Sequence, residues 1–141
     1  MQRGRRIAFD YGDARIGVAV SDPDSILASP LTTLTAGDRK LEKAIAEILA
    51  EYEPVAIYVG KPTNMDGTLG TAVDKSKVFC AMLATMSSVP IIEIDERLST
   101  VTAAKGFRQS GVKAKDAKKH IDEMAAVAIL EFAIAIEESQ S

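Results

Sequence analysis

The sequence predicts a mixed α/β fold, in which a five-stranded sheet is flanked by helices. Three apolar or β-branched segments open the chain, and their short connections suit antiparallel pairing. Segments of helical periodicity then alternate with two more short apolar segments, so the last two strands are crossover partners that run parallel to their neighbours. The chain has 141 residues, 47% of them hydrophobic and 26% charged. This composition is typical of a globular protein, and we expect one domain over residues 1–141.

The expected elements follow from the periodicity of the sequence. The strands are expected at residues 5–11, 15–21, 26–34, 55–60 and 90–96. The helices are expected at residues 41–52, 71–87, 99–110 and 121–138. Asp38 is the expected cap of the first helix, and Pro30 places the third strand at an edge or a bulge. The first, fourth and fifth strands are the most apolar, so we expect them at the centre of the sheet.

Sequence composition also excludes several classes of protein. No segment approaches the roughly 18 apolar residues of a membrane span, and no apolar signal segment begins the chain, so no membrane partner is expected. Cys80 is the one cysteine, which excludes an internal disulfide. A cytoplasmic location is therefore the expectation.

Acidic residues lie at the ends of two predicted central strands. Asp10 ends the first strand, Asp95 and Glu96 end the fifth, and Asp122 opens the last predicted helix. The first and fifth strands should end at the same edge of the sheet, which is where α/β sheets bind ligands. Asp122 shares a helical face with apolar residues that must pack on the sheet, so it should point inward. Each acid alone is equally well explained as a turn former or a helix cap, and Asp122 also as an acid favoured by the helix dipole.

Three carboxylates that converge require a counter-cation, because like charges repel more strongly when they are buried. Oxygen ligands favour Mg²⁺ or Mn²⁺, and the chain offers no histidine or thiol set for zinc. Two such ions activate a water and stabilise the leaving oxygen in phosphodiester hydrolysis. The acids therefore indicate a metal-dependent hydrolase.

Four motifs together resemble the YqgF (RuvX) family, which are nucleases similar to Holliday-junction resolvases and tied to pre-16S ribosomal RNA processing. The motifs are "FDYGDARIGVAVSD", "GKPTNMDGTLG", "DERLST" and "KKHIDEMAAVAIL", and they occur in the family's order over nearly the whole chain. The resemblance implies an RNase H-like fold. It also implies that Asp10, Glu96 and Asp122 are the catalytic, metal-binding acidic triad. Strand alternation adds mild support for Glu96 over Asp95, since Glu96 lies on the side of Ile92 and Ile94.

A basic segment lies between two of these acids. Residues 97–120 contain seven cationic residues and one acidic residue, a net charge of +6, whereas the rest of the chain carries −9. Phosphate contacts are the expected use of this segment, and a solvated helical face is the alternative. The candidate nucleic-acid-binding residues are Arg15, Lys61, Asn64, Arg97, Lys105, Arg108, Lys113, Lys118 and Lys119. For Arg15, steadying the acids or a surface ion pair are further alternatives.

The most favoured function is a metal-dependent endonuclease, with precursor ribosomal RNA as the substrate ahead of branched DNA because of the family resemblance. A non-catalytic RNA-binding factor of ribosome assembly is one rival hypothesis. An actin-like phosphotransferase is another, although that fold needs two lobes and 141 residues supply one. Nucleic acid is the expected partner, and homodimer formation is left open.

Overall fold

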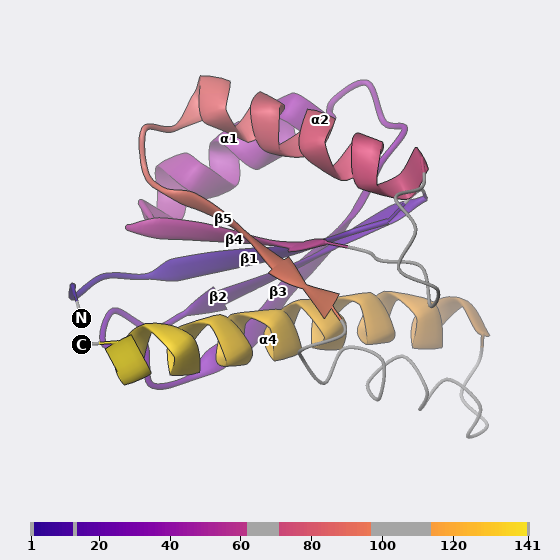
Figure 1. Cartoon of the computed structure of the whole chain (residues 1–141). Helices are drawn as coiled ribbons and strands as arrows, with labels where there is room; N and C mark the ends of the chain where they lie inside the picture. The colour runs from indigo at the N-terminus through magenta and orange to yellow at the C-terminus, as the bar shows by residue number, and fades with distance from the viewer. Residues whose placement is uncertain (1, 13, 62–70, 97–113, 141) are drawn as a thin grey trace.

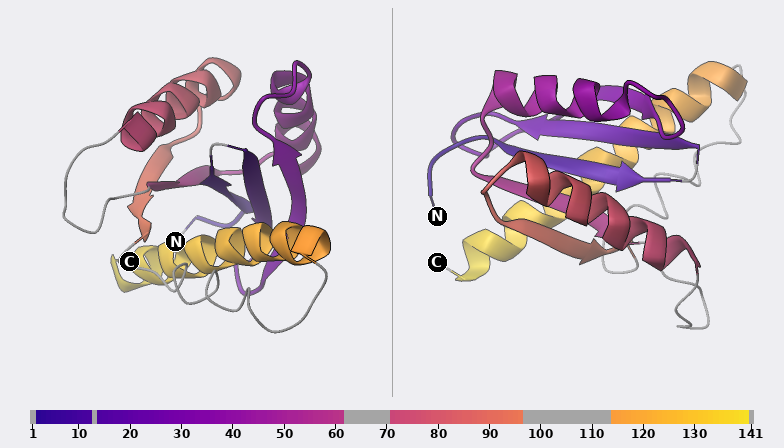
Figure 2. Two further views of the ribbon diagram at one scale, coloured as in Figure 1. Left: turned by 90° about the vertical axis from the view of Figure 1, so that its right-hand side faces the viewer. Right: turned by 90° about the horizontal axis from the view of Figure 1, so that it is seen from above.

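Helices cover both faces of a central sheet in the computed structural model (Figure 1). The structure describes residues 2–12, 14–61, 71–96 and 114–140. Two helices, α1 and α2, lie on one face, and α4 crosses the other face (Figures 1 and 2). None of the helices in the described part of the chain is long and apolar enough to cross a membrane.

The sheet has the strand order β3-β2-β1-β4-β5. The first three strands form an antiparallel meander, whereas β4 pairs in parallel with β1, and β5 in parallel with β4. The predicted mixed sheet is therefore confirmed. The strand bounds are β1 (Arg6–Tyr11), β2 (Arg15–Ser21), β3 (Ala28–Thr35), β4 (Ala56–Lys61) and β5 (Ile91–Asp95).

The prediction that the fifth strand lies at the centre is wrong, because β5 is an edge strand. β2 occupies one side of β1 and β4 occupies the other, so β5 can pair only with β4. Its isoleucines suggested full burial, but Ile94 is buried whereas Ile92 is 40% exposed. A strand at the edge of a sheet can bury its apolar side chains on one face and expose those on the other. Apolar composition therefore does not reveal where in the sheet a strand lies.

The third strand lies at the opposite edge, as Pro30 predicted. Its pairing with β2 shifts between Val18 and Ala19, whose partners are Thr32 and Pro30. This irregularity is the bulge that a proline without an N–H donor favours. The strand begins at Ala28 rather than at residue 26, because Ile26 and Leu27 belong to the preceding connection and are exposed.

The helices are α1 (Leu41–Tyr52), α2 (Thr71–Met86) and α4 (Ala114–Gln140). The bounds of α1 agree with the prediction, and α2 begins where predicted but ends one residue earlier, at Met86. Asp38 does not cap α1: the N-cap residue is Lys40, and Oδ1 of Asp38 accepts a hydrogen bond from its N–H at 2.9 Å. The helix expected at residues 99–110 lies outside the described residues.

The last helix begins much earlier than predicted, at Ala114 rather than at residue 121. Asp122 therefore lies about two turns inside the helix. The alternative explanation of Asp122 as an acid favoured by the start of the helix dipole is wrong, because that effect is confined to the first turn.

Two core layers hold the sheet and the helices together. The layer under α1 and α2 contains branched and aromatic side chains, including Ile7, Phe9 and Phe79. The layer under α4 is built largely from alanine on both sides, such as Ala8 in β1 and Ala126 in the helix. Small side chains on both surfaces let the helix and sheet approach closely. Consequently α4 crosses the carboxyl end of β1 at short range.

Candidate active site

Asp10 is a buried carboxylate near the carboxyl end of β1, with only 3% of its surface exposed. Strand alternation sends Ile7 into the core under α1 and α2 and Ala8 into the core under α4. Asp10 therefore points to the α4 side. Its backbone lies between two glycines, because it pairs with Gly17 of β2 and with Gly60 of β4.

Gly17 lets the backbone of α4 touch the sheet. A Cβ atom at this position would lie 1.9 Å from the carbonyl oxygen of Asp122 and 2.4 Å from its carbonyl carbon. Glycine in a strand interior often marks such a close approach of another backbone. The contact places Asp122, which is 8% exposed, over the β2 neighbour of Asp10.

Gly60, on the β4 side of Asp10, likewise allows a close approach to the sheet. A Cβ atom there would lie 2.4 Å from Cδ1 of Ile129 in α4 and 3.3 Å from Oε1 of Glu96. Glu96 directly follows β5, so its carboxylate reaches across the end of β4 on the α4 side. Ile94 is buried in the same core layer. This placement agrees with the alternation argument that favoured Glu96 over Asp95.

The structure thus brings the three predicted acids to one edge of the sheet. Asp10 pairs with Gly60, which Glu96 approaches, and with Gly17, which the backbone of Asp122 approaches, so Glu96 lies on the β4 side of Asp10 and Asp122 on its β2 side. The three residues come from β1, from the end of β5 and from α4, which are distant in the sequence.

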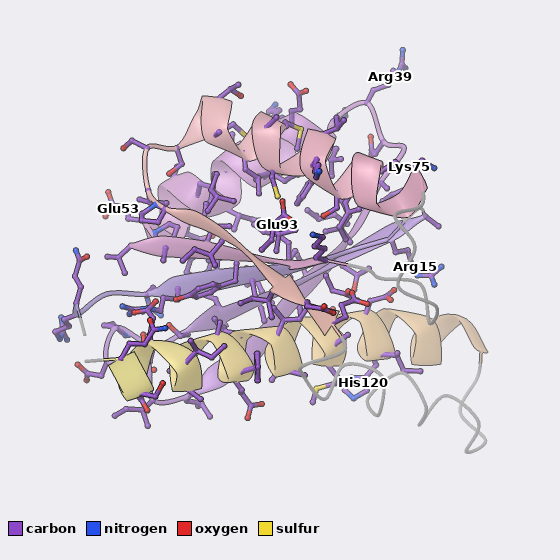
Figure 3. All side chains as sticks on the ribbon, viewed as in Figure 1. Arg15, Arg39, Glu53, Lys75, Glu93 and His120 are labelled. Carbon is purple, nitrogen blue, oxygen red and sulfur yellow. The ribbon has the colours of Figure 1, made fainter. Side chains whose placement is uncertain are left out.

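Arg15 occupies part of this arrangement. Its Nε donates a hydrogen bond of 2.6 Å to Oδ2 of Asp122, and the two side chains form an ion pair that is partly shielded from solvent. Arg15 lies at the same end of the molecule as Lys75 (Figure 3). One carboxylate of the three is therefore bonded to a guanidinium, which supplies the positive charge that Asp122 needs.

The site has the donor chemistry of a divalent-cation site but is not arranged as one. Carboxylate oxygens are the ligands that Mg²⁺ and Mn²⁺ prefer, and the glycines on both sides of Asp10 let α4 and the Glu96 carboxylate approach this edge of the sheet. However, among the described residues no three His, Cys, Asp or Glu side chains form a group that could hold a metal ion. Arg15 already engages Oδ2 of Asp122 and so competes with a cation for this carboxylate.

Several predicted nucleic-acid-binding residues lie on elements near this edge of the sheet. Lys61 is the last residue of β4 and is partly buried. Lys118 and Lys119 belong to the early turns of α4, ahead of Asp122. His120 is exposed on the side of α4 that faces away from the sheet (Figure 3). The remaining candidates lie outside the described residues: Asn64, Arg97, Lys105, Arg108 and Lys113.

Sequence reasoning missed the two glycines that shape the site. Gly17 and Gly60 interrupt otherwise apolar strands, and that interruption is the signal that could have identified them. Gly12 directly follows β1. Its N–H donates to the carbonyl oxygen of Arg15 at 3.0 Å, and a Cβ atom would lie 2.8 Å from that oxygen.

Comparison with known proteins gives a family match over residues 4–135, to the model described as RuvX, Holliday junction resolvase. A relative from Streptomyces coelicolor, named for pre-16S rRNA nuclease activity, is 46% identical over 95% of this chain and 81% of its own length. A relative of the same name from Rhodococcus opacus is also 46% identical, over 92% of this chain and 76% of its own length.

Among solved structures, the RuvC protein of Thermus thermophilus in complex with a Holliday junction substrate matches with a TM-score of 0.60. The match covers 96% of both chains at 14% sequence identity, so it concerns the fold. Fold and acidic edge together define a RuvC-like, RNase H-like α/β protein. The family match is more specific: the chain belongs to the RuvX family and is a nuclease by that membership.

Proposed function

We propose that this protein is a divalent-metal-dependent endonuclease that cleaves precursor 16S ribosomal RNA in the cytoplasm. The observation that carries the proposal is the position of Asp10. It is buried at the end of β1 between two glycines, across which Glu96 and Asp122 approach from either side. The relatives named for pre-16S rRNA nuclease activity support the choice of substrate.

Asp10, Glu96 and Asp122 would hold Mg²⁺ or Mn²⁺. Such ions, when bound, supply a water of lowered pKa and stabilise the leaving oxygen of a phosphodiester. Asp10 is fixed by strand pairing on both sides, and Asp122 by the contact of α4 with Gly17. Rigid placement of the ligands is what this chemistry requires of the protein.

Arg15 has two successive partners in this proposal. In the absence of a cation its guanidinium neutralises Asp122. With Asp122 serving as a metal ligand, the guanidinium of Arg15 would be available to a phosphate of the substrate, which offers it a bidentate partner. The basic segment of residues 97–120 supplies further phosphate contacts, which hold the nucleic acid without reading its sequence.

Branched DNA is the second candidate substrate. The specific observation in its favour is the fold shared with RuvC, which was solved with a Holliday junction. A four-way junction has twofold symmetry, so this candidate also implies that the chain acts as a homodimer. Precursor RNA requires no such symmetry.

The test is cleavage by the purified protein of precursor 16S rRNA and of four-way DNA junctions, each in Mg²⁺, in Mn²⁺ and in EDTA. We expect cleavage of the RNA with either metal and none in EDTA. Asp10→Asn should abolish cleavage while the protein stays folded. Asp38→Asn is the matched control, because Asp38 is exposed and asparagine retains the oxygen that accepts the Lys40 N–H. RNA binding without metal-dependent turnover would instead identify a non-catalytic assembly factor.

A further inference from the structure

Two large aliphatic side chains are displayed to solvent at the end of the molecule opposite Asp10. Ile26 is 83% exposed and Leu27 is 64% exposed. They lie in the connection between β2 and β3, which passes close to the C-terminal end of α4 (Figure 1). Single exposed apolar residues are ordinary, whereas contiguous exposed apolar surface is a feature of interaction sites.

The backbone that carries these two residues is held by its own hydrogen bonds. Oδ1 of Asp22 accepts the N–H groups of Ile26 and Leu27 at 2.7 and 3.0 Å. These bonds stabilise the charged carboxylate and lower the pKa of Asp22, the bond from Leu27 most strongly. Ser25 adopts a left-handed conformation with a φ of 55°, which is unfavourable for a residue with a side chain.

Ser25 is held in place by a network of buried hydrogen bonds. Its hydroxyl accepts a hydrogen bond from Nη1 of Arg6 at 2.8 Å and donates to the carbonyl oxygen of Gly4 at 3.1 Å. Arg6 is 2% exposed and forms a bidentate ion pair with Glu137 of α4. The connection is therefore a rigid platform, and the exposure of Ile26 and Leu27 is built into the fold.

A groove of about 270 Å³ separates this platform from the last turns of α4. Its lining is partly apolar, with Ile26 and Ile134, and partly acidic, with Glu131 and Glu138. No lysine or arginine occurs among the described residues that line it. Apolar anchors beside carboxylates are complementary to apolar side chains flanked by lysine or arginine.

The described lining of the groove offers no cation to a phosphate backbone, whereas the end of the molecule that carries Asp10 also carries Lys118. The two ends therefore differ in the chemistry that they offer a partner. We define the docking surface as Ile26, Leu27 and the groove lined by Glu131 and Glu138. On the basis of the proposed function, we propose that this surface binds a basic protein carried on the same precursor ribosomal RNA. Contacts to phosphate select no sequence, so a protein contact at the far end gives the nuclease a means to choose its site.

The experiment compares binding to protein-free precursor 16S rRNA with binding to the same RNA in small-subunit precursor particles. All proteins carry Asp10→Asn, so that cleavage does not interfere with the measurement. The test variant adds Ile26→Ser and Leu27→Ser. The matched control adds Val78→Ser, because Val78 is 70% exposed on α2, away from the docking surface. A second test variant adds Glu131→Gln and Glu138→Gln.

We expect both test variants to bind the particles about tenfold more weakly than the parent and the free RNA equally well, because exposed anchors dominate such contacts. The control should match the parent on both. Equal binding of parent and test variants to the particles would overturn the proposal, as would failure of the parent to bind particles. An equal loss of binding to free RNA would show that the docking surface binds RNA. A dimer in sedimentation that Ile26→Ser and Leu27→Ser abolish would show that the docking surface binds a second copy of the chain. Either outcome also overturns the proposal. Failure of the proposed nuclease function appears separately, as absence of cleavage by the wild-type protein.

Discussion

Gly17→Ala is a small change with a large predicted effect on the site. The Cβ atom that it adds would lie 1.9 Å from the carbonyl oxygen of Asp122, and the atoms in its way belong to the backbone of α4. No side-chain rotation can relieve the clash. The helix must move by roughly 1 Å at Asp122 before that distance reaches 3.0 Å, because packed interiors do not absorb such overlap.

Two magnitudes follow from this displacement. Overpacking of a well-packed core costs about 1–3 kcal/mol, so the free energy of unfolding should fall by that amount. A misplacement of about 1 Å in a catalytic group costs about 100-fold in rate. Cleavage of precursor rRNA should therefore fall by about two orders of magnitude at a temperature where the variant is still folded.

Urea unfolding and single-turnover cleavage measure the two effects. Gly37→Ala is the matched control, since nothing lies within 4 Å of the added Cβ atom and Gly37 does not have a positive φ. That variant should keep full activity, and its stability should rise slightly because alanine restricts the unfolded chain. Wild-type stability and cleavage in Gly17→Ala would refute the claim that contact at Gly17 positions Asp122.

Three further predictions concern other parts of the molecule. Arg15→Met should tighten Mn²⁺ binding in calorimetry by about fivefold, because it removes a guanidinium that competes for Asp122 through a partly exposed ion pair. Glu137→Gln should lower the free energy of unfolding by about 3 kcal/mol, because it leaves the buried guanidinium of Arg6 without its counter-charge. Burial raises the pKa of the Cys80 thiol to about 11, so iodoacetamide at pH 8 should alkylate it about 100-fold more slowly than in the unfolded chain, and the rate should climb until the pH passes that value.

Each of these predictions has a control and a contrary outcome. Arg39→Met removes an exposed cation that points away from the site, and it should leave Mn²⁺ affinity unchanged (Figure 3). Unchanged affinity in Arg15→Met as well would mean that Arg15 does not compete for Asp122. Glu131→Gln should scarcely affect stability, because Glu131 is exposed; a similar small effect of Glu137→Gln would count against the buried network. Rapid alkylation of Cys80 in the folded protein would contradict the raised pKa of its thiol.

The succession of strands along the chain was predictable because each strand is a recognisable segment of apolar or β-branched residues. β1, β2 and β4 are apolar segments bounded by turn residues, and their pairing follows from the lengths of their connections. The position of β5 was not predictable in this way. An isoleucine such as Ile92, which is 40% exposed, can occur in a central strand or in an edge strand. The apolar composition of the strand therefore led to the wrong prediction that it lies at the centre of the sheet.

The early start of α4 was missed for a different reason. Residues 114–120 are mostly alanine and lysine, which favour helix formation but show no apolar face. The pattern of apolar residues reports where a helix packs, whereas the helix itself extends beyond its packed part. The acids could be named from the sequence and the family resemblance. The glycines that bring them together could not, because close contact between α4 and the sheet is a tertiary feature.

The central claim is that Asp10, Glu96 and Asp122 together bind divalent cations. Anomalous diffraction from crystals soaked in Mn²⁺ tests it most directly. We predict an anomalous peak at coordination distance from oxygens of all three carboxylates, about 2.1–2.2 Å, with Asp122 turned away from Arg15. Crystals saturated with Mn²⁺ that show no peak between these residues, with Asp122 still bonded to Arg15, would contradict the account.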